Sequence, residues 1–234
     1  APRPAQQVKH IAVVGGGPAG VTAAITAASR GHRVELFESA PAVGGQLILA
    51  GAPPRKEKIL EYVRYLEEDL AASTVQLHLN RTFVPDDAVG FDEIILAAGA
   101  YCQNMAVPGA EAFQETAWKV LETPAAHYAG RHVAVVGAGS VGCETALYLK
   151  EGGAAAVSIV ELREKIAMDM DRISRLKLMH ELEEAQVVLY PSTVLDHVAA
   201  GNGILKCMTN QEEKEIPCDL VVIAVGAVCR QELA

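Results

Sequence analysis

The sequence predicts an α/β fold made of two similar units, each a parallel β-sheet covered by helices. Two repeats carry this prediction. Residues 9–20 return as 131–142, and each copy is a short apolar stretch that runs into the pattern G-x-G-x-x-G. Residues 92–100 return as 219–227, and each copy is an apolar stretch that ends in Ala-x-Gly. Because the opening and the closing strand are both repeated, we infer duplication of a whole Rossmann-like dinucleotide-binding unit.

The hydrophobic pattern alternates between strands and helices in both units. Strands of the first unit are expected at 11–14, 33–38, 75–79 and 93–97, and its helices at 19–29 and 56–70. Strands of the second unit are expected at 133–136, 157–160, 187–190, 194–198, 204–208 and 219–225, and its helices at 141–151 and 173–184. Residues 101–130 show no clear period and are expected to connect the units. Mostly apolar strands that alternate with helices predict parallel sheets covered on both faces.

The domain boundaries follow from these elements: a linker tail at 1–8, a first dinucleotide-binding unit at 9–104 and a second at 105–234. The chain has 234 residues, of which 50% are hydrophobic, so each unit can bury a core. A net charge of -9 argues against a nucleic-acid partner, which would require many lysines and arginines. No apolar run is long enough to cross a bilayer and no signal peptide is apparent, so we expect no membrane partner and a cytoplasmic location.

The first glycine-rich turn has the features of a site for a dinucleotide pyrophosphate at a helix N-terminus. Gly15 permits a tight turn, Gly17 leaves room for the pyrophosphate, and Gly20 lets the helix pack closely on the strand. Glu38 ends the second strand, 23 residues after Gly15, where a carboxylate can accept both ribose hydroxyls. The alternative is that Glu38 is only a solvated acid at the end of a strand.

The second turn repeats this pattern, with Glu161 placed 24 residues after Gly137. An acid at this position repels a 2'-phosphate and favours NADH over NADPH. Arg163 weakens that inference, because a guanidinium can pair with the same phosphate. Glu144, on the second helix, could approach a nicotinamide or could equally be a solvated acid on the helix face.

Cysteines and histidines give no sign of further chemistry. The five cysteines lie far apart with no metal-ligand spacing, so we interpret them as small buried hydrophobes in a reducing compartment. The seven histidines are scattered, and we interpret them as structural or surface residues. We therefore expect neither a metal site nor a catalytic acid, base or nucleophile in this chain.

These motifs resemble the two-dinucleotide fold of the pyridine nucleotide-disulfide reductase superfamily. The first turn with Glu38 resembles its FAD-binding start, and residues 44–47 resemble the loop that passes near the FAD. Residues 97–99 are similar to its A-T-G strand end, with Ala98 in place of the usual Thr. The second turn with Glu161 resembles its NAD domain. Within the superfamily, the stretches 44–54, 56–66 and 160–170 resemble the C-terminal part of the 2,4-dienoyl-CoA reductase and 2-enoate reductase family, relatives of old yellow enzyme.

The resemblance covers nearly all of the chain from residue 9 and implies FAD in the first unit and NADH, rather than NADPH, in the second. The residues expected to contact FAD are Gly15, Gly17, Pro18, Ala19, Gly20, Glu38, Gly45, Gln46, Val84, Ala98 and Gly99. The residues expected to contact NADH are Gly137, Gly139, Ser140, Val141, Gly142, Glu161 and Gly226.

Two features of the family are missing from the sequence. Its members carry an N-terminal barrel with FMN and an iron-sulfur cluster, and they return to the FAD domain after the NAD domain. We therefore expect a fragment of a longer reductase, in which the FAD unit lacks its C-terminal segment. Because the flavin ring would lack one wall, we expect weak or absent FAD retention by this chain alone.

The resemblance implies that hydride passes from NADH to FAD, and electrons then pass to the barrel, which reduces an activated C=C bond. One alternative is a non-catalytic module that binds ADP or FAD. Another is a stand-alone flavoprotein reductase similar to thioredoxin reductase, although the redox C-x-x-C of that enzyme is absent here.

Overall fold

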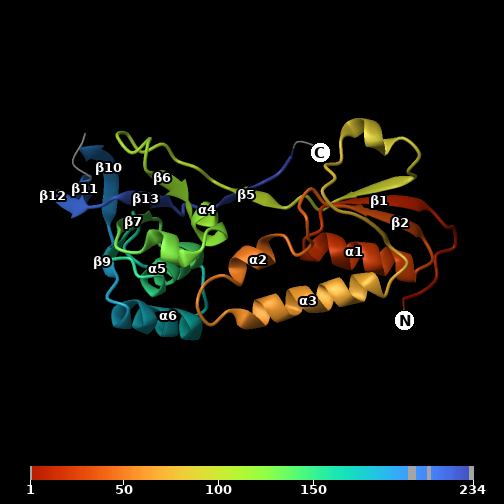
Figure 1. The fold of residues 1–234 in the computed structure, drawn as a ribbon, viewed down its shortest axis with the longest axis horizontal. Coiled ribbons are helices and arrows are strands. Elements are labelled where there is room, and N and C mark those ends of the chain that lie inside the picture. Colours follow the sequence, from red (N-terminus) through yellow and green to blue (C-terminus); the bar gives the residue numbers. More distant parts are fainter. Residues whose placement is uncertain (1, 200–203, 210–211, 232–234) are drawn as a thin grey trace. The chain divides into compact units, whose positions relative to one another are not determined.

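The computed structural model describes residues 2–199, 204–209 and 212–231 (Figure 1). The described chain forms two compact units. The first comprises 2–51, 55–101 and 229–231, and the second comprises 52–54 and 102–228 without the two gaps. The predicted α/β fold with two Rossmann-like units is confirmed, and each unit is described below by itself.

The first unit is built on a four-stranded parallel sheet in the order β3-β2-β1-β4. Its strands are β1 (His10–Val14), β2 (Arg33–Phe37), β3 (Gln76–His78) and β4 (Glu93–Leu96). Its helices are α1 (Pro18–Ser29), α2 (Gln46–Ala50), α3 (Glu57–Ala71) and the short 3-10 helix η1 (Pro85–Ala88). This order places β1, with the glycine-rich turn at its end, in the interior of the sheet.

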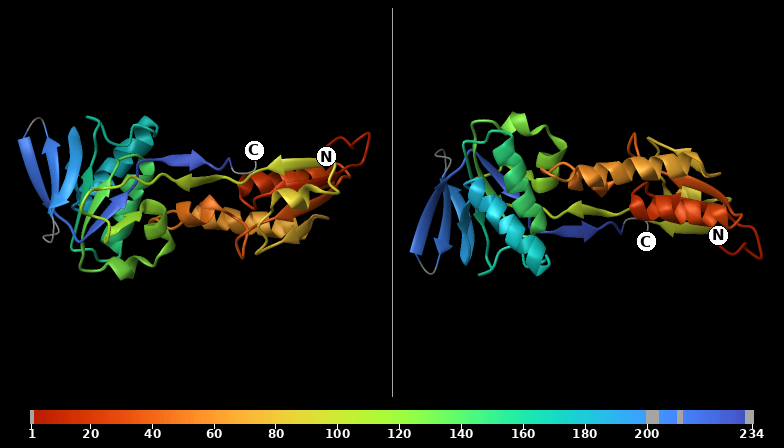
Figure 2. Two further views of the ribbon diagram at one scale, coloured as in Figure 1. Left: turned by 90° about the horizontal axis from the view of Figure 1, so that it is seen from above. Right: turned by 90° about the horizontal axis from the view of Figure 1, so that it is seen from below.

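Alternation along the strands divides the core of the first unit between two faces. Ile11 and Val13 of β1 face α1 and α3, which lie side by side (Figures 1 and 2). Ala12 and Val14 face the opposite way and pack with Phe37, Phe83 and, less deeply buried, Phe91. The second face is thus covered by the segment between β3 and β4, which contains only a short 3-10 helix.

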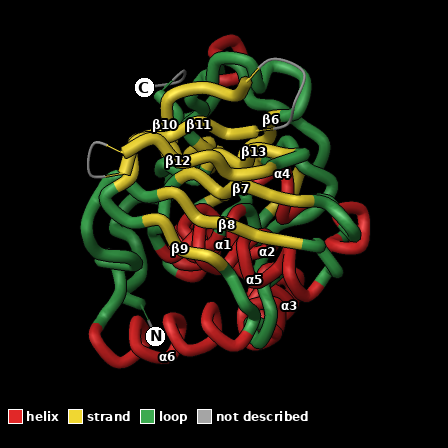
Figure 3. The backbone as a smooth tube through the Cα atoms, turned by 90° about the vertical axis from the view of Figure 1, so that its left-hand side faces the viewer, coloured by secondary structure: helices red, strands yellow, loops and turns green. Residues whose placement is uncertain are grey.

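The second unit has a five-stranded parallel sheet in the order β6-β13-β7-β8-β9 (Figure 3). These strands are β6 (Gln114–Thr116), β7 (His132–Val136), β8 (Ala156–Val160), β9 (Val188–Tyr190) and β13 (Leu220–Ile223). Its helices are α4 (Ala117–Glu122), η2 (Ala125–Tyr128), α5 (Ser140–Glu151) and α6 (Arg172–Glu184). Buried side chains of α4, α5 and α6 pack on one face of this sheet.

The other face of this five-stranded sheet is covered by a three-stranded antiparallel sheet and not by helices. β10 (Thr193–Ala199), β11 (Ile204–Thr209) and β12 (Glu212–Pro217) form an antiparallel meander. Leu205 and Ile216 of the meander pack against Val136 and Ile223. The predicted parallel sheets are present in both units, but the antiparallel pairing of β10, β11 and β12 was not predicted. β5 (Ala100–Cys102) and β14 (Ala227–Cys229) form a separate two-stranded sheet.

Eight elements of the described chain were not predicted from the sequence: α2, η1, β5, β6, α4, η2, β12 and β14. α2 begins at Gln46, where only a loop was expected, and β6 with α4 lies in the supposedly irregular region 101–130. β6 and β12 are the polar segments QET and EEKEIP, so neither shows the apolar pattern of a buried strand. Both are strands because their backbones pair with β13 and β11. The remaining predicted helices and strands are present, with ends that differ by a few residues.

Candidate dinucleotide-binding sites

The first glycine-rich turn connects β1 to α1, as predicted. Gly15 has φ +107°, and its amide donates to the carbonyl of Phe37 at 2.8 Å. A Cβ at this position would lie 2.3 Å from the carbonyl oxygen of Ala97. A Cβ on Gly20 would lie 1.8 Å from the carbonyl oxygen of Gly15. The steric roles predicted for Gly15 and Gly20 are therefore confirmed, because backbone fills the space that a side chain would need.

Gly17 is different, because the fold itself does not require a glycine there. Its φ of -71° and ψ of 178° are open to any residue, and among the described residues no atom outside its chain neighbours lies within 4 Å of a Cβ built on it. Gly17 is the N-cap of α1 and makes no side-chain cap, and Pro18 at the next position has no N–H. The free space in front of a helix N-terminus is what a pyrophosphate needs, so this turn fits the dinucleotide predicted for it.

Glu38 closes the mouth of the first turn. Its Oε2 accepts a hydrogen bond from the amide of Gly16 at 2.6 Å, and its Oε1 accepts one from the amide of Ala40 at 2.7 Å. These bonds fix the carboxylate beside the turn, at the end of β2. Each oxygen has further lone pairs, so the carboxylate can still accept ribose hydroxyls.

The loop at 44–46 also approaches this turn. A Cβ on Gly45 would lie 3.0 Å from the Cα of Gly17, and a Cβ on Gly99 would lie 3.3 Å from Nε2 of Gln46. Ala98 lies beside Gly15, at 3.2 Å from a Cβ built there. The structure thus brings together the predicted residues of the turn, the 44–46 loop and the end of β4.

Val84 is a predicted FAD-binding residue for which we describe no contact with the glycine-rich turn. It is 44% exposed and precedes η1, and its amide donates to Asp87 Oδ2 at 2.9 Å. The segment leading to it runs past the acid, because the amide of Arg81 donates to the carbonyl of Glu38 at 2.9 Å. Its expected contact with the dinucleotide stays a prediction.

The second turn repeats the first atom for atom at its main contacts. Gly137 has φ +102°, and its amide donates to the carbonyl of Val160 at 2.9 Å. A Cβ on Gly142 would lie 2.0 Å from the carbonyl oxygen of Gly137. Gly139, like Gly17, has an ordinary backbone conformation and is the N-cap of its helix, α5. The predicted Ser140 and Val141 form the first positions of α5.

Glu161 takes the place of Glu38 in the second unit. Its Oε2 accepts from the amide of Ala138 at 2.7 Å, and its Oε1 accepts from the amide of Arg163 at 2.8 Å. Both acids therefore bond the middle residue of their turn and the residue two positions after themselves. Glu144 lies on α5, and Gly226 follows β13 with φ +118°.

One residue at the second turn was not singled out from the sequence. The carboxylate of Asp169 lies at the N-terminus of α5, where both of its oxygens are 3.0 Å from the amide of Ser140. Its Oδ2 also accepts from Oγ of Ser140 at 2.6 Å. The sequence did contain a sign that this segment matters, because the surrounding stretch 160–170 resembles the reductase family. The contact between Asp169 and Ser140, however, depends on how the loop folds back.

The closing strands repeat a further contact. Asp92 precedes β4 and accepts at Oδ2 from the amide of His10 at 2.7 Å, while Asp219 precedes β13 and accepts from the amide of His132 at 2.8 Å. The two units therefore share polar contacts at both ends of the central strand. This agreement supports duplication more strongly than the glycine pattern alone.

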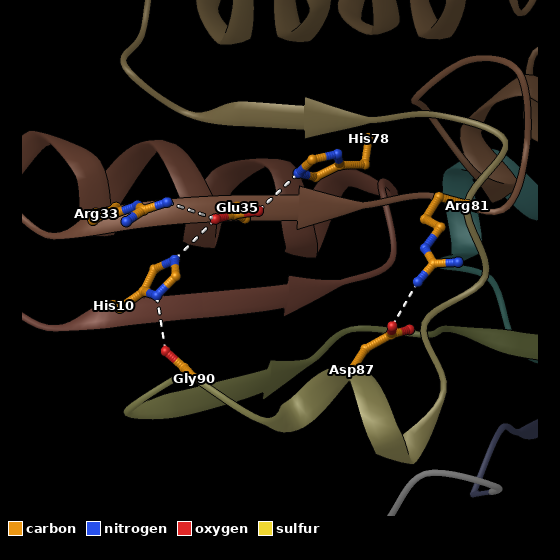
Figure 4. A network of polar contacts seen from close by, with 7 residues as sticks. All are labelled: His10, Arg33, Glu35, His78, Arg81, Asp87 and Gly90. Carbon is orange, nitrogen blue, oxygen red and sulfur yellow. Dashed lines mark hydrogen bonds and ion pairs between the residues drawn. The ribbon is translucent and has the colours of Figure 1, made fainter.

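The histidines do take part in polar contacts, although away from the turns. Figure 4 shows Glu35 of β2 between His10 of β1 and His78 of β3, with each ring Nε2 2.9 Å from a carboxylate oxygen. Nδ1 of His10 lies 2.9 Å from the carbonyl oxygen of Gly90, so only the doubly protonated ring donates to both neighbours. Burial acts to raise the pKa of Glu35, but the hydrogen bonds from both histidines outweigh it and lower this pKa. We interpret this cluster as a link between three strands.

The cysteine thiols are free, and three of the five are buried. Burial raises the pKa of Cys143, on α5, to about 12 and that of Cys218 to about 11. A thiol with so high a pKa stays protonated at neutral pH and is a poor nucleophile. Over the described ranges, no group of three or more His, Cys, Asp or Glu could hold a metal ion, and no helix is long and apolar enough to cross a membrane.

Two strand-turn-helix units, each with an acid at the mouth of its turn, define an α/β protein of the class that binds two dinucleotides. Residues 9–234 match the family model of pyridine nucleotide-disulphide oxidoreductases. The chain therefore belongs to the pyridine nucleotide-disulphide oxidoreductase family.

The chain is also similar to parts of longer proteins. It is 38% identical over 223 residues to an NADH oxidase of Thermoanaerobacter brockii, a match that covers 93% of this chain and 34% of the relative. It is also 38% identical over 230 residues to a bilirubin reductase of Mediterraneibacter gnavus, covering 96% of this chain and 35% of the relative. The solved structure of a 2-naphthoyl-CoA reductase has a TM-score of 0.89 at 24% identity, over 97% of this chain and 34% of that chain. The chain thus spans about a third of the length of these relatives.

Proposed function

We propose that this chain is the dinucleotide-binding module of an NADH-dependent flavoprotein reductase, with FAD in the first unit and NADH in the second. The observation that carries the proposal is the repeated geometry of turn and acid. In both units a glycine that the fold does not require stands at a helix N-terminus, beside a carboxylate fixed at the end of the neighbouring strand.

The residues of the chain would bind and orient the cofactors. The helix dipole of α1 and the open space at Gly17 would accommodate the pyrophosphate of FAD, and Glu38 would accept from its ribose. Glu161 would do the same for the adenosine ribose of NADH. A bound flavin supplies the redox chemistry, because it takes a hydride from reduced nicotinamide and releases electrons to an acceptor. No side chain of this module has to act as an acid, base or nucleophile in that transfer.

We propose further that the whole protein passes these electrons to an FMN and iron-sulfur barrel that reduces an activated C=C bond. The length of the relatives leaves room for additional domains, and one of them is named as a bilirubin reductase. The exposed side chains of β4 support our proposal that the first unit is incomplete, since Ile94 is 39% and Leu96 44% exposed at the edge of the sheet. Ile94 and Leu96 pair in register with Ala12 and Val14 and so lie on the same face of the sheet, and an apolar face of this kind is normally covered in a finished domain.

A simple measurement separates the reductase from a non-catalytic nucleotide module. The chain is purified, supplied with FAD and mixed anaerobically with NADH, while flavin absorbance is followed. Bleaching with NADH supports the reductase, whereas binding of FAD and ADP without bleaching supports the module. We expect FAD to be lost on gel filtration, and tightly held stoichiometric FAD would contradict the proposed incompleteness of the first unit.

The preference for NADH over NADPH is tested at Glu161. We expect the wild type to bind NADH at least about tenfold more tightly, because a 2'-phosphate would meet the carboxylate. Glu161→Gln removes the charge and should narrow this ratio, while Glu164→Gln, an exposed acid in the following loop, should not change it. Equal dissociation constants for NADH and NADPH in the wild type would refute the preference.

A further inference from the structure

The loop after the second strand belongs to the duplication, although its two copies share little sequence. Gly44 and Ala167 each lie six residues after the acid of their unit. The amide of Gly44 donates to the carbonyl of Gly16 at 2.8 Å, and the amide of Ala167 donates to that of Ala138 at 2.7 Å. Both residues have positive φ, +118° and +53°. Each loop is therefore fastened to the middle residue of its own turn by the same hydrogen bond.

This correspondence equates Asp169 with Gln46, since each lies two residues after the fastening point. The equivalent positions carry different chemistry. Gln46 is a neutral amide whose Nε2 lies near Gly99, and it makes no cap on α1. Asp169 is an acid, and its carboxylate caps the N-terminus of α5 through the amide and hydroxyl of Ser140.

Asp169 carries its negative charge where a pyrophosphate is expected. Its Oδ2 lies 3.5 Å from a Cβ built on Gly139. Gly139 is equivalent to Gly17 of the first unit, where the space around such a Cβ is open. Burial acts to raise the pKa of Asp169, but the hydrogen bonds from Ser140 outweigh it, and the pKa of the carboxyl lies below its ordinary value. The carboxylate is therefore ionised at neutral pH and makes contacts that a phosphate would make.

We propose that Asp169 is an internal competitor of the dinucleotide in the second unit. Its carboxylate takes the first N–H of α5 and the hydroxyl of Ser140, and it has to turn away before a pyrophosphate can bind them. This inference rests on the proposed binding of NADH in the second unit. Its consequence is that Asp169 weakens dinucleotide binding, so that half occupancy of this unit requires a higher cofactor concentration.

The test is a comparison of dissociation constants by isothermal titration calorimetry on the full chain, with NAD⁺ and adenosine as probes. Asp169→Asn keeps an acceptor for Ser140 but removes the charge. We expect it to bind NAD⁺ about fivefold more tightly or better, from the Coulomb energy of two close charges in water. Adenosine has no phosphate, so its affinity should not change.

Control variants separate the contact from general electrostatics and from folding. Glu164→Gln removes one negative charge from the same loop and should leave NAD⁺ affinity within about twofold of the wild type, since water and salt screen an exposed charge. Asp169→Ala serves as a second variant, and thermal melts verify that each protein is folded.

The outcomes distinguish this inference from the proposed function. If the wild type binds NAD⁺ and Asp169→Asn binds it no more tightly, the competitor is refuted and the proposed function stands. If Glu164→Gln gives the same gain, the effect is one of net charge and the competitor is again refuted. If folded wild type and both Asp169 variants all fail to bind NAD⁺, the proposed function of this unit fails together with the inference. Binding that appears only in the Asp169 variants supports both.

Discussion

The two kinds of glycine in the first turn should respond in opposite ways to replacement by alanine. Gly20→Ala places a Cβ 1.8 Å from the carbonyl oxygen of Gly15, so strand and helix have to move apart. Overpacking of this kind costs about 1–3 kcal/mol or more. At roughly 2–4 °C per kcal/mol for a protein of this size, the melting temperature should fall by about 2–12 °C.

Gly17→Ala should not destabilise the fold. Its backbone conformation suits alanine, and in the described part of the chain only its sequence neighbours lie within 4 Å of the new Cβ. The alanine also reduces the conformational freedom of the unfolded chain. We expect a free energy of unfolding equal to that of the wild type or about 0.4–1 kcal/mol higher. Affinity for FAD should fall about 10- to 100-fold, which corresponds to one or two lost hydrogen bonds to a charged group.

The assay combines a thermal melt with calorimetric titration of FAD into each variant. The second unit supplies a matched pair, because Gly142→Ala meets backbone at 2.0 Å whereas Gly139→Ala meets Asp169 Oδ2 only at the ordinary distance of 3.5 Å. In that unit the probe is NADH. The reasoning is refuted if Gly17→Ala melts as low as Gly20→Ala, or if it binds FAD as tightly as the wild type.

Three further predictions concern parts of the fold outside the turns. Glu35→Gln should lower the free energy of unfolding by about 1–3 kcal/mol at neutral pH. Because the pKa of Glu35 is lowered in the folded state, the difference in unfolding free energy between the variant and the wild type should be present above the ordinary pKa of 4.5 and should vanish as the pH falls through the folded pKa. Urea unfolding at several pH values measures this difference. In a timed alkylation followed by mass spectrometry, exposed Cys229 should react before Cys143, and early labelling of Cys143 would contradict its burial. Asp171→Ala removes the side chain that accepts from the amides of Ile173 and Ser174 at the start of α6. The free energy of unfolding should fall by about 1 kcal/mol, which a thermal melt measures. An unchanged melting temperature would show that this cap is not needed.

The helices and strands could be predicted wherever a local pattern specifies them. The apolar strands β1 and β7, the glycine turns and the acids Glu38 and Glu161 all lie where the sequence predicts them. Each depends on residues that are close in the chain, because a turn, a strand and the following helix form one local unit. Helix α3 was equally predictable, since one apolar stripe is enough to identify it.

The polar strands β6 and β12 could not be predicted in this way. Their side chains are largely exposed or polar, and only a neighbouring strand makes them extended. The same holds for the Glu35 cluster, whose three members lie far apart in the sequence and meet because β1, β2 and β3 are adjacent in the sheet.

The sequence by itself determined that this protein contains two copies of one dinucleotide-binding unit, because steric demands on glycine and the spacing of the acid are local properties. Only the tertiary structure decided what stands at the mouth of each turn. Asp169 reaches α5 because the loop after β8 folds back and fastens to Ala138, while the equivalent loop in the first unit brings Gly45 to Gly17. Contacts between distant segments depend on how the chain packs. Two loops that make the same hydrogen bond to their turns can therefore place different side chains, a neutral amide and an acid, at equivalent positions.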